Sequence, residues 1–257
     1  MEQWRGKRML ITGASAGIGE ACAKKAAQNG IDLVLCARRK ERLETLRKEI
    51  QEINPVAVDL FEVDVRERRS VEAMLQTLEA QEKMPDILMN NAGLSQGLDP
   101  MDKADIGDWE RMIDTNLKGL LYITRLLLPH LKTRSLAHII NLGSIAGRQV
   151  YPGGSVYNAT KSAVHALNEA MNIDLLGTPV RVSLIAPGAV KTEFSEVRFH
   201  GDKSRAENVY QGYQPLEAAD IADAVMYVLG APPHVNVQEI VIMPTAQRNA
   251  YLVDRGH

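Results

Sequence analysis

The stretch MLITGASAGIG at residues 9–19 decides the fold. Four residues suited to a short buried strand, 9–12, lead into a turn with glycines at positions 13, 17 and 19, and a helical pattern follows from Ile18. Such a turn allows close backbone approach to a pyrophosphate, whose charge the helix N-terminus stabilises. The spacing G-x-x-x-G-x-G differs from the commoner G-x-G-x-x-G, so a plain tight strand–helix turn remains an alternative.

Strand-like and helix-like segments alternate along the rest of the chain. Short apolar runs predict further strands at 32–36, 56–65, 86–90, 138–142, 180–185 and 239–243. Helices are predicted at 18–29, 40–53, 67–81, 105–131, 155–176 and 218–229. Strands separated by helices indicate a parallel sheet covered on both faces. We therefore expect an α/β fold, a Rossmann-type doubly wound parallel sheet of about seven strands, in a single domain over residues 1–257.

One segment interrupts this alternation. Residues 192–214 are polar and irregular, with only weak helical patterns. Long irregular segments in compact domains are often lids or binding loops. We expect this segment to be a lid over a substrate.

Composition narrows the class of protein. The net charge of −2 gives no basic excess for nucleic-acid binding. No apolar run has the length of a membrane span or a signal peptide, and two cysteines, Cys22 and Cys36, give no disulfide framework. The six histidines lack metal-ligand spacing. We expect a cytoplasmic protein that acts on a small molecule, without a metal, a membrane or a nucleic acid.

Tyr157 and Lys161 form a Y-x-x-x-K pair, preceded by Ser144 and Asn116. On a helix, residues four positions apart lie on one face. A phenol has a pKa of about 10, and a nearby positive charge favours the phenolate. A poised tyrosine in a chain that can hold a dinucleotide suggests hydride transfer to or from a carbon that bears oxygen. Taken singly, each of the four residues could instead be a core or surface residue.

The second predicted strand is followed by Arg38 and Arg39. Dinucleotide-binding folds usually place an acidic residue here to bind the ribose 2′-hydroxyl. Two guanidinium groups suit a 2′-phosphate instead, with Ser15 in the turn as a further donor. The sequence therefore predicts NADP rather than NAD, unless the arginines merely begin a charged helix.

The ends of the third and fourth predicted strands offer further cofactor contacts. Asp64, followed by Val65, could meet the adenine amino group, or it could cap the next helix. Asn91, Ala92 and Gly93 follow the fourth strand, and the small Ala-Gly pair would let the backbone lie along the cofactor.

Together these motifs resemble the short-chain dehydrogenase/reductase family. The matches are TGASAGIG at 12–19, NNAG at 90–93, Asn116, Ser144, Tyr157 with Lys161, and Pro187-Gly188. The stretches DWERMIDTNLKGLLYITRLLLP, TEFSEVRFHGD and HVNVQEIVIMP resemble more narrowly the NADP-dependent 3-hydroxy acid dehydrogenases, which act on serine, L-allo-threonine, 3-hydroxypropionate or malonic semialdehyde.

The resemblance implies a role for each catalytic position. Tyr157 would be the general acid and base. Lys161 would hold the nicotinamide ribose and lower the Tyr157 pKa, helped by the positive nicotinamide. Ser144 would orient the substrate oxygen, and Asn116 would fix a helix irregularity and a proton-relaying water. The resemblance also implies cofactor contacts from a set of residues in the glycine turn and after the sixth strand: Gly13, Ser15, Gly17, Ile18, Gly19, Pro187, Gly188, Val190 and Thr192.

The residues that hold the substrate are less constrained. Arg148, Gln149 and Tyr151 follow Ser144 closely, so we expect them to face the same pocket. Arg198 lies in the expected lid and is either a carboxylate ligand or a surface charge. The alternative functions are a ketoreductase for an acyl thioester, a sugar or a cyclic ketone, a non-catalytic dinucleotide sensor, and a scaffold protein.

The predicted helix at 105–131 is apolar nearly all round, and the helix after Ser155 carries several alanines. A helix that is apolar on more than one side is buried on more than one side. We expect a symmetric interface through these helices, and the family resemblance implies a homotetramer. Two packed layers within one subunit are the alternative.

Overall fold

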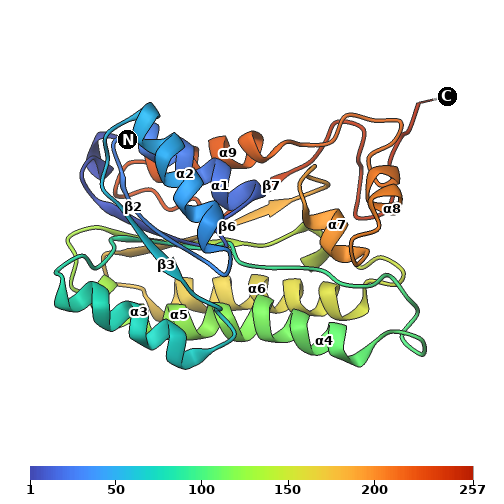
Figure 1. The fold of residues 1–257 in the computed structure, drawn as a ribbon, viewed down its shortest axis with the longest axis horizontal. Coiled ribbons are helices and arrows are strands. Elements are labelled where there is room, and N and C mark those ends of the chain that lie inside the picture. The colour runs from blue at the N-terminus through green and yellow to red at the C-terminus, as the bar shows by residue number, and fades with distance from the viewer. Residues whose placement is uncertain (257) are drawn as a thin grey trace.

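Seven parallel strands form one sheet in the computed structural model, which describes residues 1–256 (Figure 1). The strands are β1 Arg8–Thr12, β2 Asp32–Ala37, β3 Val58–Glu62, β4 Ile87–Asn90, β5 Ala137–Leu142, β6 Val180–Pro187 and β7 Glu239–Ile242. Their order is β3-β2-β1-β4-β5-β6-β7, and every neighbouring pair is parallel. The strand order reverses between β1 and β4, and ligands of such sheets bind beyond the carboxyl ends of the strands at that point.

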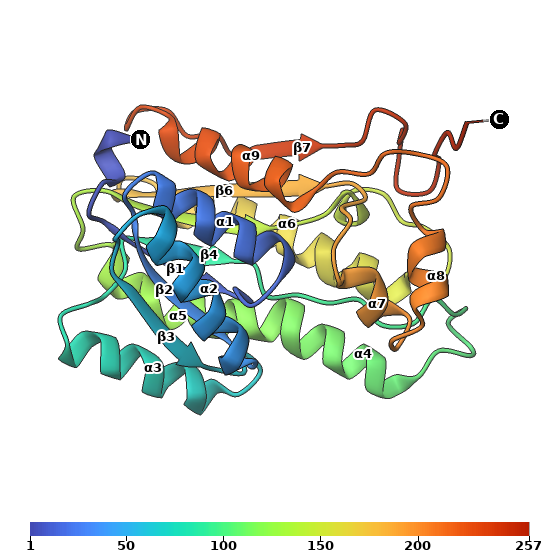
Figure 2. The same cartoon turned by 45° about the horizontal axis from the view of Figure 1, so that its top comes forward.

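Helices cover both faces of the sheet. They are α1 Gly17–Gln28, α2 Lys40–Ile53, α3 Arg68–Ala80, α4 Ile106–Ile113, α5 Leu120–Leu131, α6 Ser155–Asp174, α7 Phe194–Arg198, α8 Lys203–Asn208 and α9 Ala218–Gly230. In Figure 1, α1, α2 and α9 lie on one face, and α3, α4, α5 and α6 lie on the other. Turning the molecule places α9 and β7 at one edge and α3 and β3 at the opposite edge (Figure 2).

Each face of the sheet has its own hydrophobic core. One core joins alternate residues of β1, β2 and β4 to the buried faces of α1, α2 and α9. The other joins the intervening residues of the same strands, together with most buried residues of β5 and β6, to α3, α5 and α6. All eight residues of β6 are buried. Central strands of a parallel sheet have no solvent face, which is why these segments read as continuous apolar runs rather than alternating ones.

The predicted fold class is confirmed, with two differences in detail. The predicted helix at 105–131 is divided by a π-helical segment, Asp114–Gly119, between α4 and α5. The segment 192–214 contains the two short helices α7 and α8. Its ends are brought together by an isolated parallel bridge between Val190 and Leu216. Among the described residues, no helix combines the length and the apolar character that crossing a membrane requires.

Candidate active site

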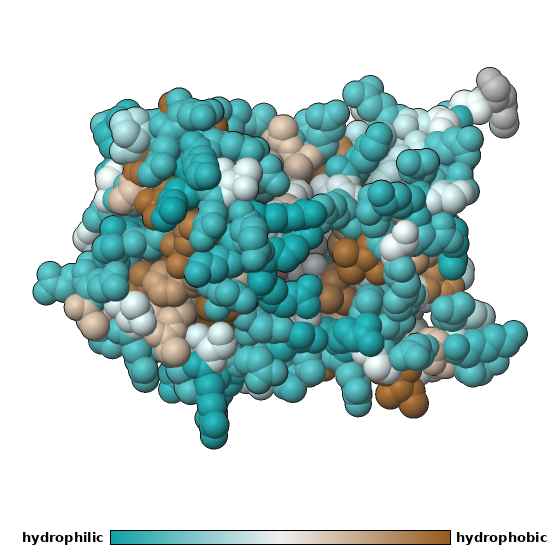
Figure 3. All heavy atoms as spheres, in the orientation of Figure 1, coloured by the Kyte–Doolittle hydropathy of each residue, from teal (hydrophilic) through white to brown (hydrophobic). Residues whose placement is uncertain are grey.

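A cleft of about 330 Å³ lies over the carboxyl ends of the strands from β3 to β6. In the space-filling view, hydrophobic side chains are visible in a hollow within a mostly hydrophilic surface (Figure 3). The predicted cofactor residues all line this cleft except Gly19. Ser144, Tyr157 and Lys161 line it as well. The structure therefore brings together residues that lie up to 179 positions apart in the chain, from Gly13 to Thr192 (192 − 13).

The glycine turn requires glycine at two positions for both conformation and space. Gly13 has a φ of +64°, and a Cβ there would lie 2.9 Å from the Cα of Ala92. Gly17 has a φ of +58°, and a Cβ there would lie 3.2 Å from the side chain of Thr192. This region of φ is strained for residues with a side chain. The turn is thus specified by packing against the strand ends as well as by its own backbone.

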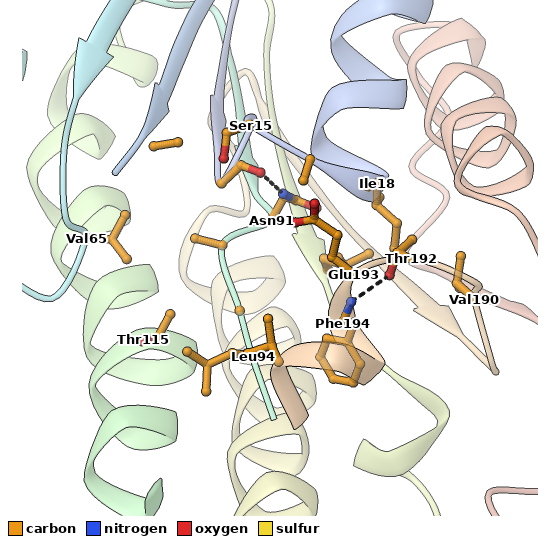
Figure 4. A pocket seen from close by; sticks show the side chains of 18 of the residues that line it. Ser15, Ile18, Val65, Asn91, Leu94, Thr115, Val190, Thr192, Glu193 and Phe194 are labelled. Atoms are coloured by element: carbon orange, nitrogen blue, oxygen red, sulfur yellow. Dashed lines mark hydrogen bonds between the residues drawn. The ribbon is translucent and has the colours of Figure 1, made fainter. Parts of the chain in front are cut away.

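Gly19 acts behind the cleft rather than in it. A Cβ at this position would lie 2.5 Å from Nδ2 of Asn91 and 2.6 Å from the carbonyl oxygen of Gly13. The Asn91 amide donates to the carbonyl oxygen of Thr12 at 2.8 Å. It also donates to the carbonyl oxygen of Gly13 at 3.2 Å (Figure 4). Gly19 therefore lets α1 approach β4 closely, and Asn91 ties the turn to the end of that strand.

Basic residues gather where the sequence predicts the adenosine phosphate. Nε of Arg39 lies 3.3 Å from Oγ of Ser15, and Arg38 lines the cleft beside it. Arg39 also pairs with Glu193 at 2.9 Å, and Arg42 forms an ion pair with the same carboxylate. The pKa of Glu193 lies below its usual value, chiefly because of the hydrogen bond from Arg42.

Asp64 does not cap the following helix, whose N-cap residue is Glu67. Its carboxylate accepts hydrogen bonds from the Arg66 guanidinium, from Nε at 2.9 Å and from Nη2 at 2.5 Å. These bonds hold the pKa of Asp64 below its usual value. Asp64 and Val65 both line the cleft, so an adenine ring there would share the Asp64 carboxylate with Arg66.

Tyr157 and Lys161 lie side by side on α6, and both are buried. Nζ of Lys161 lies 6.0 Å from the centroid of the Tyr157 ring and donates a hydrogen bond of 2.8 Å to the carbonyl oxygen of Leu142. Burial raises the pKa of Tyr157 to about 12, against the opposing charge of Arg198 and a hydrogen bond with Ser144. Burial lowers the pKa of Lys161 to about 8. Burial therefore favours the neutral phenol of Tyr157 and the neutral amine of Lys161 over their charged forms.

Asn116 is buried in the π-helical segment and does not line the cleft. Its Oδ1 accepts from the backbone N–H of Leu94, and its Nδ2 donates to the Leu94 carbonyl oxygen, both at 2.8 Å. Nδ2 also lies 3.1 Å from Oγ1 of Thr160. The expected helix irregularity is present, and it lets Asn116 fix the backbone that runs past Gly93 into the cleft.

Ser144 lies just after β5 and is the N-cap residue of a short 3₁₀-helix, Ile145–Gly147. Its Oγ accepts a hydrogen bond of 3.1 Å from the backbone N–H of Ala146. A ring nitrogen of His165 lies 3.0 Å from the Ser144 carbonyl oxygen. The other ring nitrogen lies 3.6 Å from the carboxylate of Glu239 on β7. These contacts fix the Ser144 backbone between α6 and β7.

Arg198 reaches Tyr157 from α7. Its guanidinium carbon lies 5.6 Å from the Tyr157 ring centroid, 5.7 Å from that of Tyr151 and 5.1 Å from that of Phe194. Nη2 donates to the Tyr151 hydroxyl at 3.1 Å. Nε is buried and has no hydrogen-bond partner within residues 1–256. The segment 192–214 thus supplies a positive charge beside Tyr157.

The expectation that Arg148 and Gln149 face the pocket is corrected by the structure. Arg148 forms an ion pair with Glu239, with Nε at 2.7 Å from Oε1, and Gln149 accepts from the backbone N–H of Ala250 in the C-terminal segment. Neither lines the cleft, and Tyr151 and Arg198 do not line it either, although both pack beside Tyr157. The 3₁₀-helix after Ser144 turns the chain away from the cleft, so only Tyr151 of this predicted group packs near Tyr157.

Several residues that line the cleft are absent from the sequence-based set. They are Ala16, Ala37, Val63, Leu94, Thr115, Leu142, Gly143, Glu193, Phe194 and Val197. Figure 4 shows the Glu193 side chain extending from the loop after β6 into the pocket. Glu193 and Phe194 directly follow the predicted residue Thr192, so their place in the motif TEF could have indicated that they line the cleft. Leu94 and Thr115 reach the cleft through the course of a loop and a helix, which no local sequence pattern indicates.

A family model described as short chain dehydrogenase matches residues 7–203. The chain belongs to this family. It is 46% identical over 245 residues to the NADP-dependent 3-hydroxy acid dehydrogenase YdfG of Salmonella typhi, covering 95% of this chain and 97% of that protein. It is 41% identical over 249 residues to sulfoacetaldehyde reductase 2 of Chromohalobacter salexigens, covering 96% and 98%.

A solved structure supports the same placement. The closed form of serine dehydrogenase complexed with NADP+ matches with a TM-score of 0.89 at 45% identity, covering 95% of this chain and 98% of that one. Both resemblances predicted from the sequence, to the family and to its 3-hydroxy acid dehydrogenases, are confirmed.

Proposed function

We propose that this short-chain dehydrogenase is an NADP-dependent enzyme that interconverts a small 3-hydroxy acid and the corresponding carbonyl compound. One observation carries the proposal. A single cleft is lined at one end by the glycine turn and two arginines, and at the other by Ser144, Tyr157 and Lys161. The names of the relatives agree with this reading, since YdfG is an NADP-dependent 3-hydroxy acid dehydrogenase and the solved serine dehydrogenase was complexed with NADP+.

The residues present fit an NADP molecule. The spaces that a Cβ at Gly13 or Gly17 would fill lie at the N-terminus of α1, where a pyrophosphate is stabilised. Arg38, Arg39 and Ser15 would hold the 2′-phosphate, because guanidinium groups bind phosphate oxygens in a bidentate manner. When bound, NADP supplies the hydride donor or acceptor and, in its oxidised form, a positive nicotinamide ring.

Tyr157 is the proposed proton-transfer residue. In alcohol oxidation its oxygen takes the proton of the substrate hydroxyl, and in carbonyl reduction it returns that proton. Ser144 holds the substrate oxygen beside Tyr157. With the pKa of Tyr157 at about 12 in the chain alone, the protonated form needed for reduction predominates at neutral pH. Oxidation requires added positive charge, and Lys161 and Arg198 are the chain's own cations near the ring.

Arg198, together with Tyr151, is the proposed ligand of the substrate carboxylate. Its guanidinium lies against the Tyr157 ring and has an unpaired buried Nε, so a carboxylate near Tyr157 would satisfy a donor that otherwise lacks a partner. Two relatives act on small molecules with an acid group, a 3-hydroxy acid and sulfoacetaldehyde by their names. An arginine binds either a carboxylate or a sulfonate oxygen.

The remaining expectations are part of the same proposal. Residues 192–214 would act as the substrate lid of a single catalytic domain, in the cytoplasm. A homotetramer is supported by exposed apolar side chains on α4, α5 and α6, of which Ile106 is 67% and Ile173 is 68% exposed in the single chain. Large exposed apolar residues on neighbouring helices favour a subunit interface over an internal layer.

A substrate screen tests the proposal directly. Purified enzyme is assayed by NADPH absorbance with serine, L-allo-threonine, 3-hydroxypropionate and sulfoacetaldehyde beside neutral alcohols and a 3-ketoacyl thioester, each with NADP and with NAD. We expect the small acids with NADP to give the highest kcat/KM. Preference for a neutral alcohol or the thioester would establish the ketoreductase alternative. Cofactor binding without turnover of any of them would support a dinucleotide sensor.

A further inference from the structure

Glu193 occupies an unexpected position for an acidic residue. It directly precedes α7 on the lid segment, yet its carboxylate pairs with Arg39 at 2.9 Å and with Arg42 on the opposite side of the cleft. Arg39 at the same time contacts Ser15 of the glycine turn at 3.3 Å. An acidic side chain from the lid is thus placed among the cations that the proposed function assigns to the 2′-phosphate.

The local charge balance shows what this carboxylate does. Three guanidinium groups, those of Arg38, Arg39 and Arg42, follow β2 within five residues of one another, and within residues 1–256 Glu193 is the acidic partner of two of them. Arg38 forms no ion pair among the described residues. A phosphate dianion bound at Arg38 and Arg39 would lie close to the Glu193 carboxylate, and like charges at such separations repel.

The pair is also a mechanical link. Its two sides belong to segments 154 positions apart, as the separation of Arg39 and Glu193 shows. Thr192 packs on the Gly17 position, and Arg198, the cation next to Tyr157, lies five residues after Glu193. Whatever moves Glu193 therefore moves the segment that carries the proposed substrate ligand.

From these contacts we infer that Glu193 is a phosphate surrogate that sets the preference between the two cofactors. In the cofactor-free chain its carboxylate neutralises Arg39 and Arg42 and holds the start of the lid against the glycine turn. A 2′-phosphate competes for Arg39 and displaces Glu193, whereas a cofactor without that phosphate leaves the pair intact. This inference rests on the proposed assignment of the arginines to the 2′-phosphate.

Binding of two small probes isolates the effect from catalysis. Adenosine 2′,5′-bisphosphate carries the 2′-phosphate and 5′-AMP lacks it, and neither contains nicotinamide. Isothermal titration gives the Kd of each for the unaltered enzyme and for Glu193→Gln. Because the ion pair is about half exposed, we expect the bisphosphate to bind roughly threefold to tenfold more tightly to Glu193→Gln, with the 5′-AMP affinity unchanged. The gain should shrink as salt is added.

Glu196→Gln is the matched control. Glu196 is on the same short helix, is exposed and forms no ion pair among the described residues, so this change removes the same charge three residues away. It should leave both affinities unchanged.

Limited proteolysis tests separately whether the ion pairs of Glu193 hold the lid segment in place. Lys191, Arg198 and Lys203 offer trypsin sites in and beside the lid segment. Cleavage there should be faster in cofactor-free Glu193→Gln than in the unaltered enzyme. Saturating bisphosphate, but not 5′-AMP, should speed cleavage of the unaltered enzyme.

The outcomes separate the two assignments. If the unaltered enzyme binds the bisphosphate no better than 5′-AMP, the arginines do not recognise a 2′-phosphate, and both the cofactor assignment and this inference are overturned. If it prefers the bisphosphate but Glu193→Gln binds it equally or more weakly, Glu193 orients Arg39 instead, and only this inference is overturned. If Glu196→Gln raises the bisphosphate affinity as much as Glu193→Gln does, the effect comes from the net charge of the region and not from the ion pairs of Glu193. That result would also overturn the inference.

Discussion

The two ends of the cleft are built in different ways. The glycine-turn end consists of backbone held by buried strand ends, with Asn91 and Thr12 hydrogen-bonded to each other and to the turn. The lid end, named for the proposed role of residues 192–214, consists of side chains on and beside α7, a helix of five residues. It is held by contacts such as the one between Nε2 of His200 and the Asp108 carboxylate at 3.0 Å. A backbone site presents one fixed shape, whereas side chains on a short helix can be exchanged. We therefore attribute most of the cofactor contacts to the first end and substrate choice to the second, with Glu193 as the residue of the second end that reaches the arginines of the first.

The largest expected effect comes from Tyr157, which belongs to both ends. Tyr157→Phe keeps the ring that packs against Phe194 but removes the hydroxyl, so turnover should fall by at least about 10²-fold. Cofactor affinity, measured by fluorescence titration, should be retained. Near-normal turnover would mean that another group carries the proton.

Arg198 tests the lid end alone. Arg198→Ala should lower kcat/KM for serine or 3-hydroxypropionate by about tenfold to a hundredfold, because a charge-assisted hydrogen bond contributes about 1.5–3 kcal/mol. A neutral alcohol should be affected far less. Arg148→Ala is the matched control, since this arginine pairs with Glu239 outside the cleft and should not discriminate between acids and alcohols. Equal losses for both substrate types in Arg198→Ala would reduce its role to stabilising the lid.

Lys161 tests whether the burial of its ammonium group lowers the stability of the folded enzyme. Its pKa is about 8 in the folded chain, below the ordinary value of 10.5, so the unfolded chain binds more protons between these two values. The free energy of unfolding of the cofactor-free enzyme should therefore rise as pH increases from 8 to 10.5. Lys161→Met should remove this rise.

Below pH 8 the same variant should be more stable than the unaltered enzyme by about 1–3 kcal/mol, while activity is lost. Urea unfolding at pH 7 and pH 10 measures both quantities. A variant that is less stable at pH 7 would show that the hydrogen bond from Lys161 to Leu142 outweighs the burial of the ammonium group.

The smallest effect is expected at the outer part of the glycine-turn end. Replacing Arg38 and Arg39 together with alanine should raise the KM for NADP about tenfold, because both side chains are largely exposed and phosphate contacts there are partly screened. The KM for NAD should change little. Equal use of NADP and NAD by the unaltered enzyme would contradict the predicted preference.

The clustering of the glycine-turn residues with the strand ends could be predicted from the sequence, because these residues are adjacent or directly follow strands. Once β1 and β4 are parallel neighbours, residues 13 and 91–93 must meet at one edge of the sheet. The pair Tyr157 and Lys161 was predictable for a similar reason, since helical spacing alone puts both side chains on one face.

The lid end was predicted less well because closeness in sequence does not determine where a side chain points. Arg148 is only four residues from Ser144, but a 3₁₀-helix turns it towards Glu239, a residue 91 positions away. Glu193 was missed because an acidic residue in a polar segment gives no local signal. Its pairing depends on how far the segment after β6 reaches across the cleft.

The bridge between Val190 and Leu216 has a consequence for how such an enzyme can change over evolutionary time. Backbone hydrogen bonds from Lys191 to Leu216 and from Leu216 to Ala189 close the neck of the segment between β6 and α9. The residues between those positions form a segment whose two ends are held together, so its length can vary without moving either end. A lineage, or a protein engineer, can exchange that segment for another of different length while the sheet keeps its register, so new substrates become accessible without rebuilding the dinucleotide site.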